Sequence, residues 1–559
     1  MTPTHETPRA VLAVQGLSIR LRNGPAGAAG KTLVHDLSLQ VHAGETLCIV
    51  GESGSGKSLT SLAVMGLLPA DSLQASSGSI ALDGTELLGL GAGRMRALRA
   101  SQLAMVFQEP MTALNPVHRV GRQVEEVLKL HTSLSAPQRR ARVLRMLEAV
   151  RLPDIERIYA SYPHQLSGGQ RQRIVIAMAL ILEPRLLIAD EPTTALDVTT
   201  QKQILALIRE LQAQHGTAVV FITHDFGVVA EIADRILVMH QGRVVESGSR
   251  EQILSRPREE YTRMLVASVP SLVPHTRVAP AGETILRVQD LDKSYPKSRG
   301  WWRRPEAVRA AHGVSLALRR GEILGIVGES GSGKSTVARC IVRLLDPSGG
   351  EIRLRQDDIT RLGRGALLPL RKRIQIVFQD PYRSLNPRRR IGDSVIEGLL
   401  NYGMPRAEAL DKAAQAMELV GLPRQSLDRY PHQFSGGQRQ RICIARALVM
   451  EPDVLIADEA VSALDVSVQA QVLELLEEVR RRVGIGVLFI THDLRVAAQI
   501  CDTVVVMQAG RVVEAGTVQQ VLGAPREAYT RALIDAAPGR HWDFRNFRPA
   551  PTPAQALAA

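Results

Sequence analysis

The segment GESGSGKS occurs twice in this chain of 559 residues, the first time directly after the apolar run Leu47–Val50. Its glycines let backbone N–H groups converge on phosphate oxygens, its lysine adds a positive charge, and its last serine offers a hydroxyl to Mg²⁺. A Gly/Ser turn before a helix is the simpler explanation, but a full match that occurs twice argues against it. The predicted phosphate-binding residues are Gly51, Glu52, Ser53, Gly54, Ser55, Gly56, Lys57 and Ser58, and Gly328, Glu329, Ser330, Gly331, Ser332, Gly333, Lys334 and Ser335.

The rest of the chain is duplicated as well. Lys57 and Lys334 lie 277 positions apart, whereas Ser167 and Ser435, in the segments LSGGQ and FSGGQ, lie 268 apart. The same spacing of 268 relates the later motifs of the two halves. A constant spacing over several motifs indicates one domain design used twice.

The boundary between the copies is expected at Ser268–Glu283, which has three prolines and no apolar periodicity. The predicted domains are residues 1–267 and 284–538, joined by this linker at 268–283. Residues 539–559 are Pro- and Ala-rich and are expected to form a disordered tail. Within each half, short β-branched or leucine-rich runs alternate with helical patterns, which predicts an α/β fold with a buried parallel sheet.

An Asp-Glu pair ends an apolar run in each half, in LLIADE and VLIADE. The first carboxylate, of Asp190 or Asp458, stands at a strand end where it can hold Mg²⁺. The second, of Glu191 or Glu459, can act on an attacking water. A lone pair of this kind often only caps a strand or faces solvent, but here it accompanies a phosphate-binding loop.

Four further polar residues recur at matched strand ends. Gln108 and Gln379 follow apolar runs in FQEP and FQDP, so each amide is expected to point toward the metal. His224 and His492 follow FIT, where a neutral imidazole can hydrogen-bond near a terminal phosphate. Each residue alone would be interpreted as a surface or core residue, but their recurrence favours a place in the site.

The segments LSGGQ and FSGGQ each precede a helical run. Ser167 with Gly169, and Ser435 with Gly437, therefore present a hydroxyl and backbone amides at a helix N-terminus, which can bind an anion. A helix cap that binds no ligand explains these residues equally well on their own.

Taken together, these motifs resemble the ABC ATPase family over both halves of the chain. The resemblance implies two P-loop nucleotide-binding domains, each with a RecA-like parallel-sheet core, an antiparallel β subdomain and a helical signature subdomain. It implies ATP hydrolysis with Mg²⁺. The implied metal ligands are Ser58, Gln108 and Asp190 in one half and Ser335, Gln379 and Asp458 in the other, with Glu191, His224 and Gln108, and Glu459, His492 and Gln379, as catalytic residues.

The resemblance also implies that the two domains pack head to tail. Each ATP would then meet the loop and carboxylates of one half and the signature segment of the other. Ser435 and Gly437 would complete the first site, Ser167 and Gly169 would complete the second, and Asp197 and Asp465 would connect them.

Longer segments narrow the resemblance to the ATPases of dipeptide, oligopeptide and nickel importers. These are FQEPMTALNP, FQDPYRSLNP and the YPHQ(L/F)SGGQRQR segments, together with 256–270 and 524–538, which resemble a C-terminal extension and keep a Tyr-Thr pair at Tyr261 and Tyr529. The chain is similar to fused ATPases of glutathione and peptide uptake. This implies a peripheral protein on the cytoplasmic face of the bacterial inner membrane, with two separate transmembrane permease subunits and a periplasmic or extracellular substrate-binding protein that acts indirectly. The substrate stays open, as does the direction of transport beyond this resemblance.

The halves differ where the family stacks an aromatic ring on adenine. Tyr295 in LDKSYPK fits this role, whereas LSIRLRN has Leu21, so weaker ATP binding is expected at the first site. Pro192 is replaced by Ala460 in the second half without a change in the carboxylates, so both sites are expected to hydrolyse ATP. Some members of the family that this chain resembles hold an iron–sulfur cluster with cysteines near the C-terminus. No cysteine follows Cys501, so no such cluster is expected here.

Composition limits the classes of partner that this chain is expected to bind. A net charge of +13 suits nucleic acid, an anionic membrane or an acidic ligand, but aromatic residues make up only 3% of the chain, so no nucleic-acid partner is expected. The four scattered cysteines fit a reducing cytoplasm, and no segment reaches the length needed to span a bilayer. A ribosome-acting tandem ATPase of the ABC-F kind would need a long charged helical linker, whereas the linker here is short and proline-rich. A DNA-repair ABC protein would need zinc ligands or long insertions, which the sequence also lacks. Both alternatives are therefore disfavoured.

Overall fold

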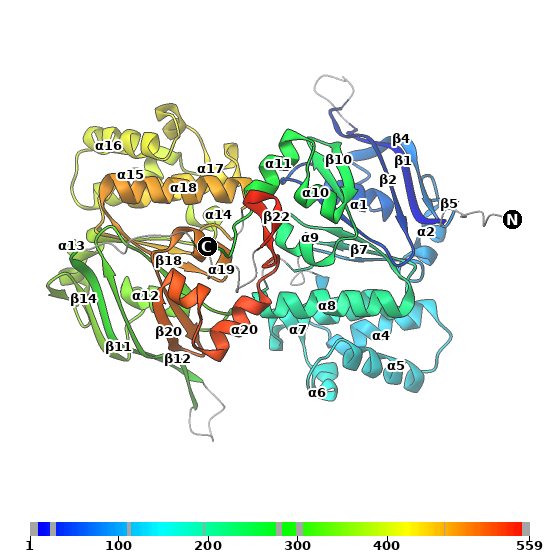
Figure 1. Cartoon of the computed structure of the whole chain (residues 1–559), viewed down its shortest axis with the longest axis horizontal. Helices are drawn as coiled ribbons and strands as arrows, with labels where there is room; N and C mark the ends of the chain where they lie inside the picture. Colours follow the sequence, from blue (N-terminus) through cyan, green and yellow to red (C-terminus); the bar gives the residue numbers. More distant parts are fainter. Residues whose placement is uncertain are drawn as a thin grey trace. The chain divides into compact units, whose positions relative to one another are not determined.

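The computed structural model of the chain describes residues 9–22, 30–108, 113–193, 196–274, 282–297, 306–462 and 464–550. Contacts within the chain divide it into two units, residues 1–269 with 546–559, and residues 270–545. The division falls inside the Pro-rich segment 268–283, of which 275–281 lie outside the described residues. Figure 1 labels the elements, which follow nearly the same order in both units.

The first unit contains a six-stranded sheet in the order β10-β9-β3-β8-β7-β6. All neighbouring strands are parallel except β10, which runs antiparallel to β9. Strands β3, β7 and β8 are buried at every residue, as expected for apolar strands covered on both faces. The bounds are β3 (Thr46–Val50), β6 (Leu103–Val106), β7 (Leu186–Asp190), β8 (Ala218–Ile222), β9 (Arg235–His240) and β10 (Arg243–Ser249).

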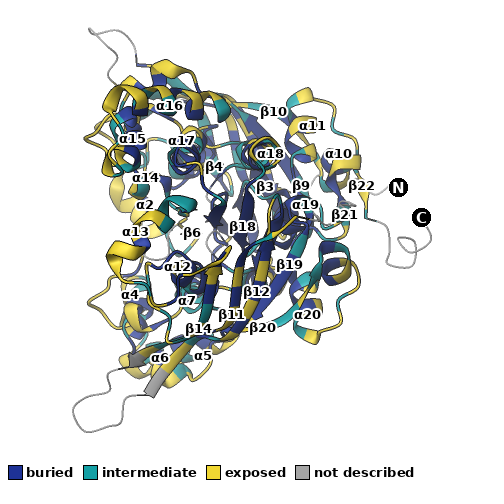
Figure 2. Cartoon of the chain, turned by 90° about the vertical axis from the view of Figure 1, so that its left-hand side faces the viewer, coloured by how far each residue is buried: buried dark blue, intermediate teal, exposed yellow. Residues whose placement is uncertain are grey.

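The second unit repeats this sheet in the order β16-β17-β18-β13-β19-β20, again with only the last pair antiparallel. Figure 2 shows β18 of this sheet as buried, while helices such as α16 and α20 carry exposed residues. The bounds are β13 (Ile323–Val327), β16 (Ile374–Val377), β17 (Val454–Asp458), β18 (Gly486–Thr491), β19 (Thr503–Gln508) and β20 (Arg511–Thr517).

Each unit adds a four-stranded antiparallel sheet, in the orders β2-β1-β4-β5 and β12-β11-β14-β15. Both sheets of a unit share one core: Leu17 and Ile80 from the antiparallel sheet of the first unit belong to the same hydrophobic cluster as Ile49 and Ile188 from its parallel sheet. The bounds are β1 (Ala10–Leu21), β2 (Thr32–His42), β4 (Leu73–Leu82), β5 (Thr85–Glu86), β11 (Thr284–Lys297), β12 (Glu306–Arg319), β14 (Gly349–Leu354) and β15 (Asp357–Asp358).

Helices connect the strands, and the sequence marks where several of them begin. Ser167 and Ser435 each accept a hydrogen bond from the backbone N–H three residues later and so cap α7 and α17. In the first unit the helices are α1 (Lys57–Val64), α2 (Ala92–Leu98), α4 (Val120–His131), α5 (Ala136–Ala149), α6 (Ile155–Ala160), α7 (Gly168–Leu180), α8 (Val198–His215), α9 (Phe226–Ile232), α10 (Arg250–Ser255) and α11 (Glu260–Ala267).

The helices of the second unit match them. Helices α15, α16 and α17 pack together, as α4, α5 and α7 do in the first unit, and so form the helical subdomain that the resemblance implied. The helices of the second unit are α12 (Lys334–Ile341), α13 (Arg364–Arg373), α14 (Pro381–Ser384), α15 (Ile391–Asn401), α16 (Arg406–Leu419), α17 (Gly436–Leu448), α18 (Val466–Val483), α19 (Leu494–Ile500) and α20 (Ala528–Ala536), with a π-helical turn at Gln519–Gly523 and 3₁₀ turns at Arg424–Asp428 and Pro431–Gln433. The first unit has a 3₁₀ turn at Pro163–Gln165.

The predicted α/β class is therefore confirmed, including a mainly parallel core and an antiparallel subdomain in each unit. All four cysteines are buried, and burial raises the pKa of Cys340 and of Cys443 to about 11, which suits packing residues. Within the described ranges, no helix is both long and apolar enough to cross a membrane.

The prediction of a disordered tail from residue 539 is wrong for residues 539–550. This segment forms β21 (Trp542–Asp543), a 3₁₀ turn at Phe544–Asn546 and β22 (Arg548–Pro549), and the Phe544 side chain is buried. The prolines and alanines suggested a tail without structure, but this segment also holds three large aromatic side chains, Trp542, Phe544 and Phe547, which favour burial. Residues 551–559 lie outside the described residues.

Candidate functional site

Four neighbouring strands of each parallel sheet end beside one another, and each is followed by candidate site residues. In the first unit, β3 leads into the loop 51–56, β6 leads to Gln108, β7 ends at Asp190, and β8 is followed by His224. The strands run in parallel in the order β3-β8-β7-β6, so their carboxyl ends share one edge. In the second unit, β13, β18, β17 and β16 repeat this arrangement.

The phosphate loop has a backbone that only glycine adopts readily. Gly51, Gly54 and Gly56 have φ angles of 149°, 82° and 99°. A Cβ atom on Gly51 would also lie 2.2 Å from the carbonyl oxygen of Met239. In the second unit, Gly328, Gly331 and Gly333 have φ angles of 148°, 81° and 102°.

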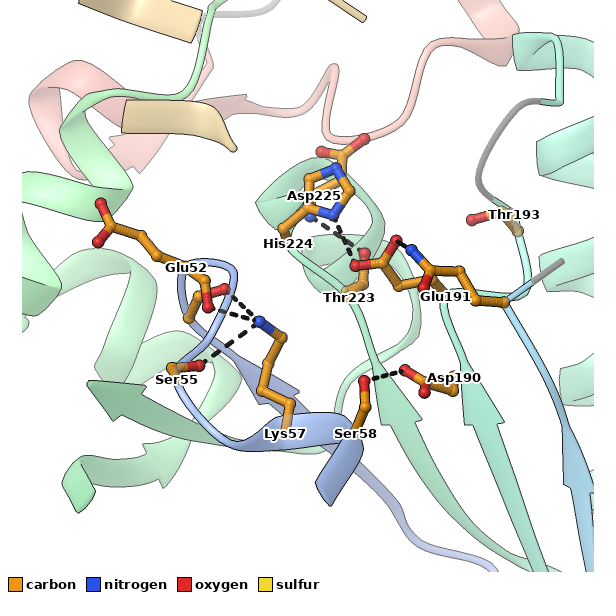
Figure 3. A network of polar contacts seen from close by, with 12 residues as sticks. Glu52, Ser55, Lys57, Ser58, Asp190, Glu191, Thr193, Thr223, His224 and Asp225 are labelled. Carbon is orange, nitrogen blue, oxygen red and sulfur yellow. Dashed lines mark hydrogen bonds and ion pairs between the residues drawn. The ribbon is translucent and has the colours of Figure 1, made fainter. Parts of the chain in front are cut away.

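The lysine of each loop is buried among the loop's own carbonyl groups. The Lys57 ammonium donates to the carbonyl oxygens of Gly51, at 2.7 Å, and of Glu52, at 2.9 Å (Figure 3). Lys334 makes the matching bonds at 2.8 Å each. The two lysines are only 7% and 4% exposed. Each loop therefore holds a desolvated positive charge where a phosphate is expected.

The first carboxylate of each Asp-Glu pair lies against the last residue of the loop. The Ser58 hydroxyl donates to Asp190 Oδ1 at 3.3 Å, and the Ser335 hydroxyl donates to Asp458 Oδ1 at 2.9 Å. Burial raises the pKa of both aspartates, the adjacent glutamate adds to the rise, and the serine hydroxyl opposes it. A hydroxyl and a buried carboxylate form an all-oxygen donor set, and this set fits Mg²⁺.

Three contacts hold Glu191, two at its carboxylate and one at its backbone. Glu191 Oε2 accepts from the Gln108 amide at 2.8 Å, and Glu191 Oε1 lies 2.9 Å from Nδ1 of His224. The Glu191 backbone N–H donates to the carbonyl oxygen of Ile222 at 2.9 Å. Figure 3 shows Glu191 and His224 turned toward each other beside the loop.

Both glutamates have a left-handed backbone, with φ of 48° at Glu191 and 49° at Glu459. A residue other than glycine adopts this conformation at a cost of order 1–2 kcal/mol. The three contacts around Glu191 hold it there. Nothing in the sequence signals this turn, and sequence analysis did not find it.

The second unit forms the same cluster, and there the glutamate and histidine shift each other's pKa values. Glu459 Oε2 accepts from Gln379 at 2.8 Å, and Oε1 lies 3.4 Å from Nδ1 of His492. Burial alone would raise the pKa of Glu459, but His492 and Lys334 lower it below its ordinary value. Burial would likewise lower the pKa of His492, but Glu459 raises it. His492 is thus shifted toward the charged form, away from the neutral imidazole that the sequence suggested.

The two positions where the sequence predicts a difference in adenine stacking differ in burial, and the stacking itself stays a prediction. Leu21 is partly buried and packs against the hydrophobic core of its own unit. Tyr295 is 37% exposed, and the Lys293 ammonium lies 5.3 Å from its ring centroid. An exposed ring in the second unit is available to a base, whereas Leu21 offers none.

The signature glycines are required by the packing of neighbouring helices. A Cβ on Gly169 would lie 2.7 Å from Thr200 Cγ2, and a Cβ on Gly437 would lie 2.1 Å from Val468 Cγ1. Asp197 caps α8 by accepting from the Thr200 backbone N–H at 2.9 Å. The signature serines cap their helices as described above. Their anion-binding role and the connecting role of Asp197 and Asp465 stay predictions.

The structure thus brings together the loop, aspartate, glutamate, glutamine and histidine of each half. Residues 109–112 of FQEPMTALNP lie outside the described residues. One contact was missed: the Tyr261 and Tyr529 hydroxyls accept from the backbone N–H groups of Glu52 and Glu329. The repeated Tyr-Thr pair was the only signal for it.

Comparison with known proteins agrees with these motifs. The family profile described as "ABC transporter" matches residues 34–194 and 311–462, and the profile described as "Oligopeptide/dipeptide transporter, C-terminal region" matches 245–308 and 513–555. The chain is 48% identical to the glutathione import ATP-binding protein of Escherichia coli O157:H7 over 94% of this chain and 89% of that protein. The protein of the same name from Shigella flexneri is 47% identical over the same shares. A solved dimeric ATP-binding cassette in a post-hydrolysis state, bound to ADP and Pi, is 29% identical and covers 42% of this chain and 98% of its own, with a TM-score of 0.38.

The coupling between Glu459 and His492 predicts a specific titration. Their ordinary pKa values are 4.5 and 6.5, and the glutamate pKa is lowered while the histidine pKa is raised. Their interaction therefore stabilises the folded chain fully between about pH 4.5 and 6.5. It is lost as the pH falls through the pKa of Glu459 or rises through that of His492.

Glu459→Gln should lower the pKa of His492, because burial is then opposed only by the smaller effect of the Asp493 charge. The measurement is a pH titration of the imidazole NMR signal, assigned by its loss in His492→Gln. Glu451→Gln, which removes a surface partner of Lys412, is the control and should leave this pKa unchanged. An unshifted His492 in Glu459→Gln would refute the coupling.

Proposed function

The chain belongs to the ABC transporter family of ATP-binding proteins, and from that premise we propose that it is the ATP-hydrolysing subunit of a bacterial importer. The observation that carries the proposal is the cluster of loop lysine, aspartate, glutamate, glutamine and histidine, which is complete in both units. Such a cluster can bind a triphosphate and act on a water beside it.

The proposed cargo is a peptide or a related small solute of the dipeptide, oligopeptide, glutathione or nickel type. Support comes from the oligopeptide/dipeptide C-terminal profile, which matches after both cassettes, and from the relatives named for glutathione import. We propose that the chain sits on the cytoplasmic face of the inner membrane, bound to two permease subunits. A periplasmic or extracellular binding protein would deliver the substrate to the permeases.

In the proposed mechanism the loop binds the triphosphate through its backbone N–H groups and its lysine. The Lys57 ammonium is already desolvated and held by two carbonyl groups, so it can pair with a terminal phosphate after a small movement. Ser58, Asp190 and Gln108 would hold Mg²⁺, which supplies positive charge to the β- and γ-phosphate oxygens. Ser335, Asp458 and Gln379 would do the same in the second unit.

Glu191 and Glu459 are the proposed general bases. A water held by Glu191 attacks the γ-phosphorus, the bond to the bridging oxygen breaks, and the glutamate takes the water's proton, which leaves ADP and phosphate. His224 and Gln108 fix the two carboxylate oxygens and so aim the base. A carboxylate held at both oxygens keeps its direction without reorganising during the reaction.

We further propose that the signature segments complete the sites of the opposite half. Ser435 and Gly437 would serve the site of Lys57, and Ser167 and Gly169 that of Lys334. This assignment rests on the family resemblance. The capped N-termini of α7 and α17 support it, because they offer backbone N–H groups to an anion.

Replacing both bases should stop turnover and spare binding. In Glu191→Gln/Glu459→Gln, ATP hydrolysis should fall by roughly 10²- to 10⁴-fold, the usual contribution of a general base. MgATP affinity should stay within about threefold, because the amide keeps the size of the side chain. Steady-state phosphate release and equilibrium nucleotide binding measure the two quantities.

Glu156→Gln is the matched control, since it removes a surface carboxylate that pairs with Arg140. Its turnover should equal that of the wild type. Normal hydrolysis by the double variant would contradict the proposed mechanism.

The two sites should bind ATP with unequal affinity. Tyr295→Leu, which copies Leu21 into the second unit, should weaken the tighter site by roughly 1 kcal/mol or more, about fivefold, through loss of stacking. Titration with a fluorescent ATP analogue resolves the two affinities. Tyr402→Leu makes the same change elsewhere in that unit and should have no effect. Two equal affinities in the wild type would count against this account.

A further inference from the structure

A tyrosine hydroxyl touches the phosphate loop of each unit from the C-terminal extension. The Glu52 backbone N–H donates to the hydroxyl oxygen of Tyr261, on α11, at 3.4 Å. The Glu329 N–H donates to the hydroxyl of Tyr529, on α20, at 3.3 Å. The partners lie 209 and 200 residues apart in sequence, and the contact occurs independently in both units.

The peptide group that each tyrosine touches is also the one that holds the lysine. The Glu52 N–H and the Gly51 carbonyl belong to one peptide group. Its carbonyl oxygen accepts from the Lys57 ammonium at 2.7 Å while its N–H donates to Tyr261. Hydrogen bonds linked through one peptide polarise each other, so the tyrosine strengthens the lysine's carbonyl partner. In the second unit, the peptide between Gly328 and Glu329 is held in the same way.

The helix that carries the tyrosine is itself fixed to the parallel sheet. In the first unit, the buried Glu246 carboxylate on β10 accepts from the backbone N–H groups of Arg258 at 2.8 Å and Glu259 at 3.2 Å, just before α11. The Tyr261 ring stacks on His240 at the end of β9, with centroids 4.0 Å apart.

The second unit fixes α20 by a matching carboxylate. Glu514 accepts from the backbone N–H groups of Arg526 at 2.8 Å and Glu527 at 3.3 Å. The residue that matches His240 is Gln508, which has no ring. Thr262 and Thr530, next to each tyrosine, are fully buried. The hydroxyl is therefore delivered by an anchored helix in both units.

We propose that Tyr261 and Tyr529 are positioning residues that fix the loop peptide against which the lysine rests, and that each C-terminal extension thereby sets the ATP affinity of its own unit. This inference rests on the proposed ATPase function. A loop held in its binding conformation loses less conformational entropy when nucleotide binds. The hydroxyl acts through the peptide, so it affects binding more than the chemical step.

The test compares Tyr261→Phe/Tyr529→Phe with wild type in the full-length chain. Phenylalanine keeps each ring, and with it the stacking of position 261 on His240, and removes only the hydroxyl. KM for ATP should rise about two- to fivefold. This is the lower half of the effect expected for the loss of a hydrogen bond, because the N···O distances of both contacts are long. Turnover at saturation should stay unchanged. Tyr402→Phe removes a hydroxyl that donates to the Leu368 carbonyl and should leave KM unchanged.

A second readout separates positioning from simple support of the fold. The rise in melting temperature on adding MgATP should be smaller in the double variant than in wild type at equal nucleotide concentration. A lowered melting temperature with unchanged KM and an unchanged MgATP-induced rise would overturn the inference. If wild type itself hydrolysed no ATP, the proposed function would fail, while the MgATP-induced rise would still test the tyrosines.

Discussion

Each unit is organised around a lysine ammonium buried in a loop of backbone carbonyl groups. Taking an ammonium out of water costs several kcal/mol unless it finds partners, and Lys57 and Lys334 each find two carbonyl oxygens within their own loop. The loop curls tightly enough to do this only with glycine at its left-handed positions. The ammonium has already been desolvated, so a triphosphate can bind it as a stronger partner than the carbonyl groups.

The remaining site residues lie beside the phosphate loop because four parallel strands end at the same edge of the sheet. The loop, the Asp-Glu pair, the glutamine and the histidine each follow a different strand, so sheet order alone gathers them. The strained backbone of Glu191 and Glu459 turns each carboxylate toward its glutamine and histidine. The tyrosine of each C-terminal extension accepts a hydrogen bond from a backbone N–H of the loop, that of Glu52 or Glu329, whereas the lysine binds the carbonyl groups.

Short motifs in the sequence encode most of each site. Glycine spacing fixes the loop, and a polar residue after an apolar run marks a strand end, so Lys57, Asp190 and Gln108 were predictable. The Tyr261 contact was not, because its partner is a backbone N–H that any residue supplies, 209 positions away. The left-handed turn at Glu191 was missed because glutamate carries no preference for it. The tail was misjudged because Trp542 and Phe544 outweigh the surrounding prolines and alanines.

The most direct test of this account is the number of nucleotides bound per chain when one lysine loses its charge. In a background of Glu191→Gln/Glu459→Gln, Lys57→Gln and Lys334→Gln keep a hydrogen-bond donor for the loop carbonyls but remove the ammonium. At MgATP about tenfold above the parent's weaker dissociation constant, equilibrium dialysis should give two nucleotides for the parent and one for each lysine variant. Two nucleotides bound with unchanged affinity in either lysine variant would contradict the central role of the buried charge.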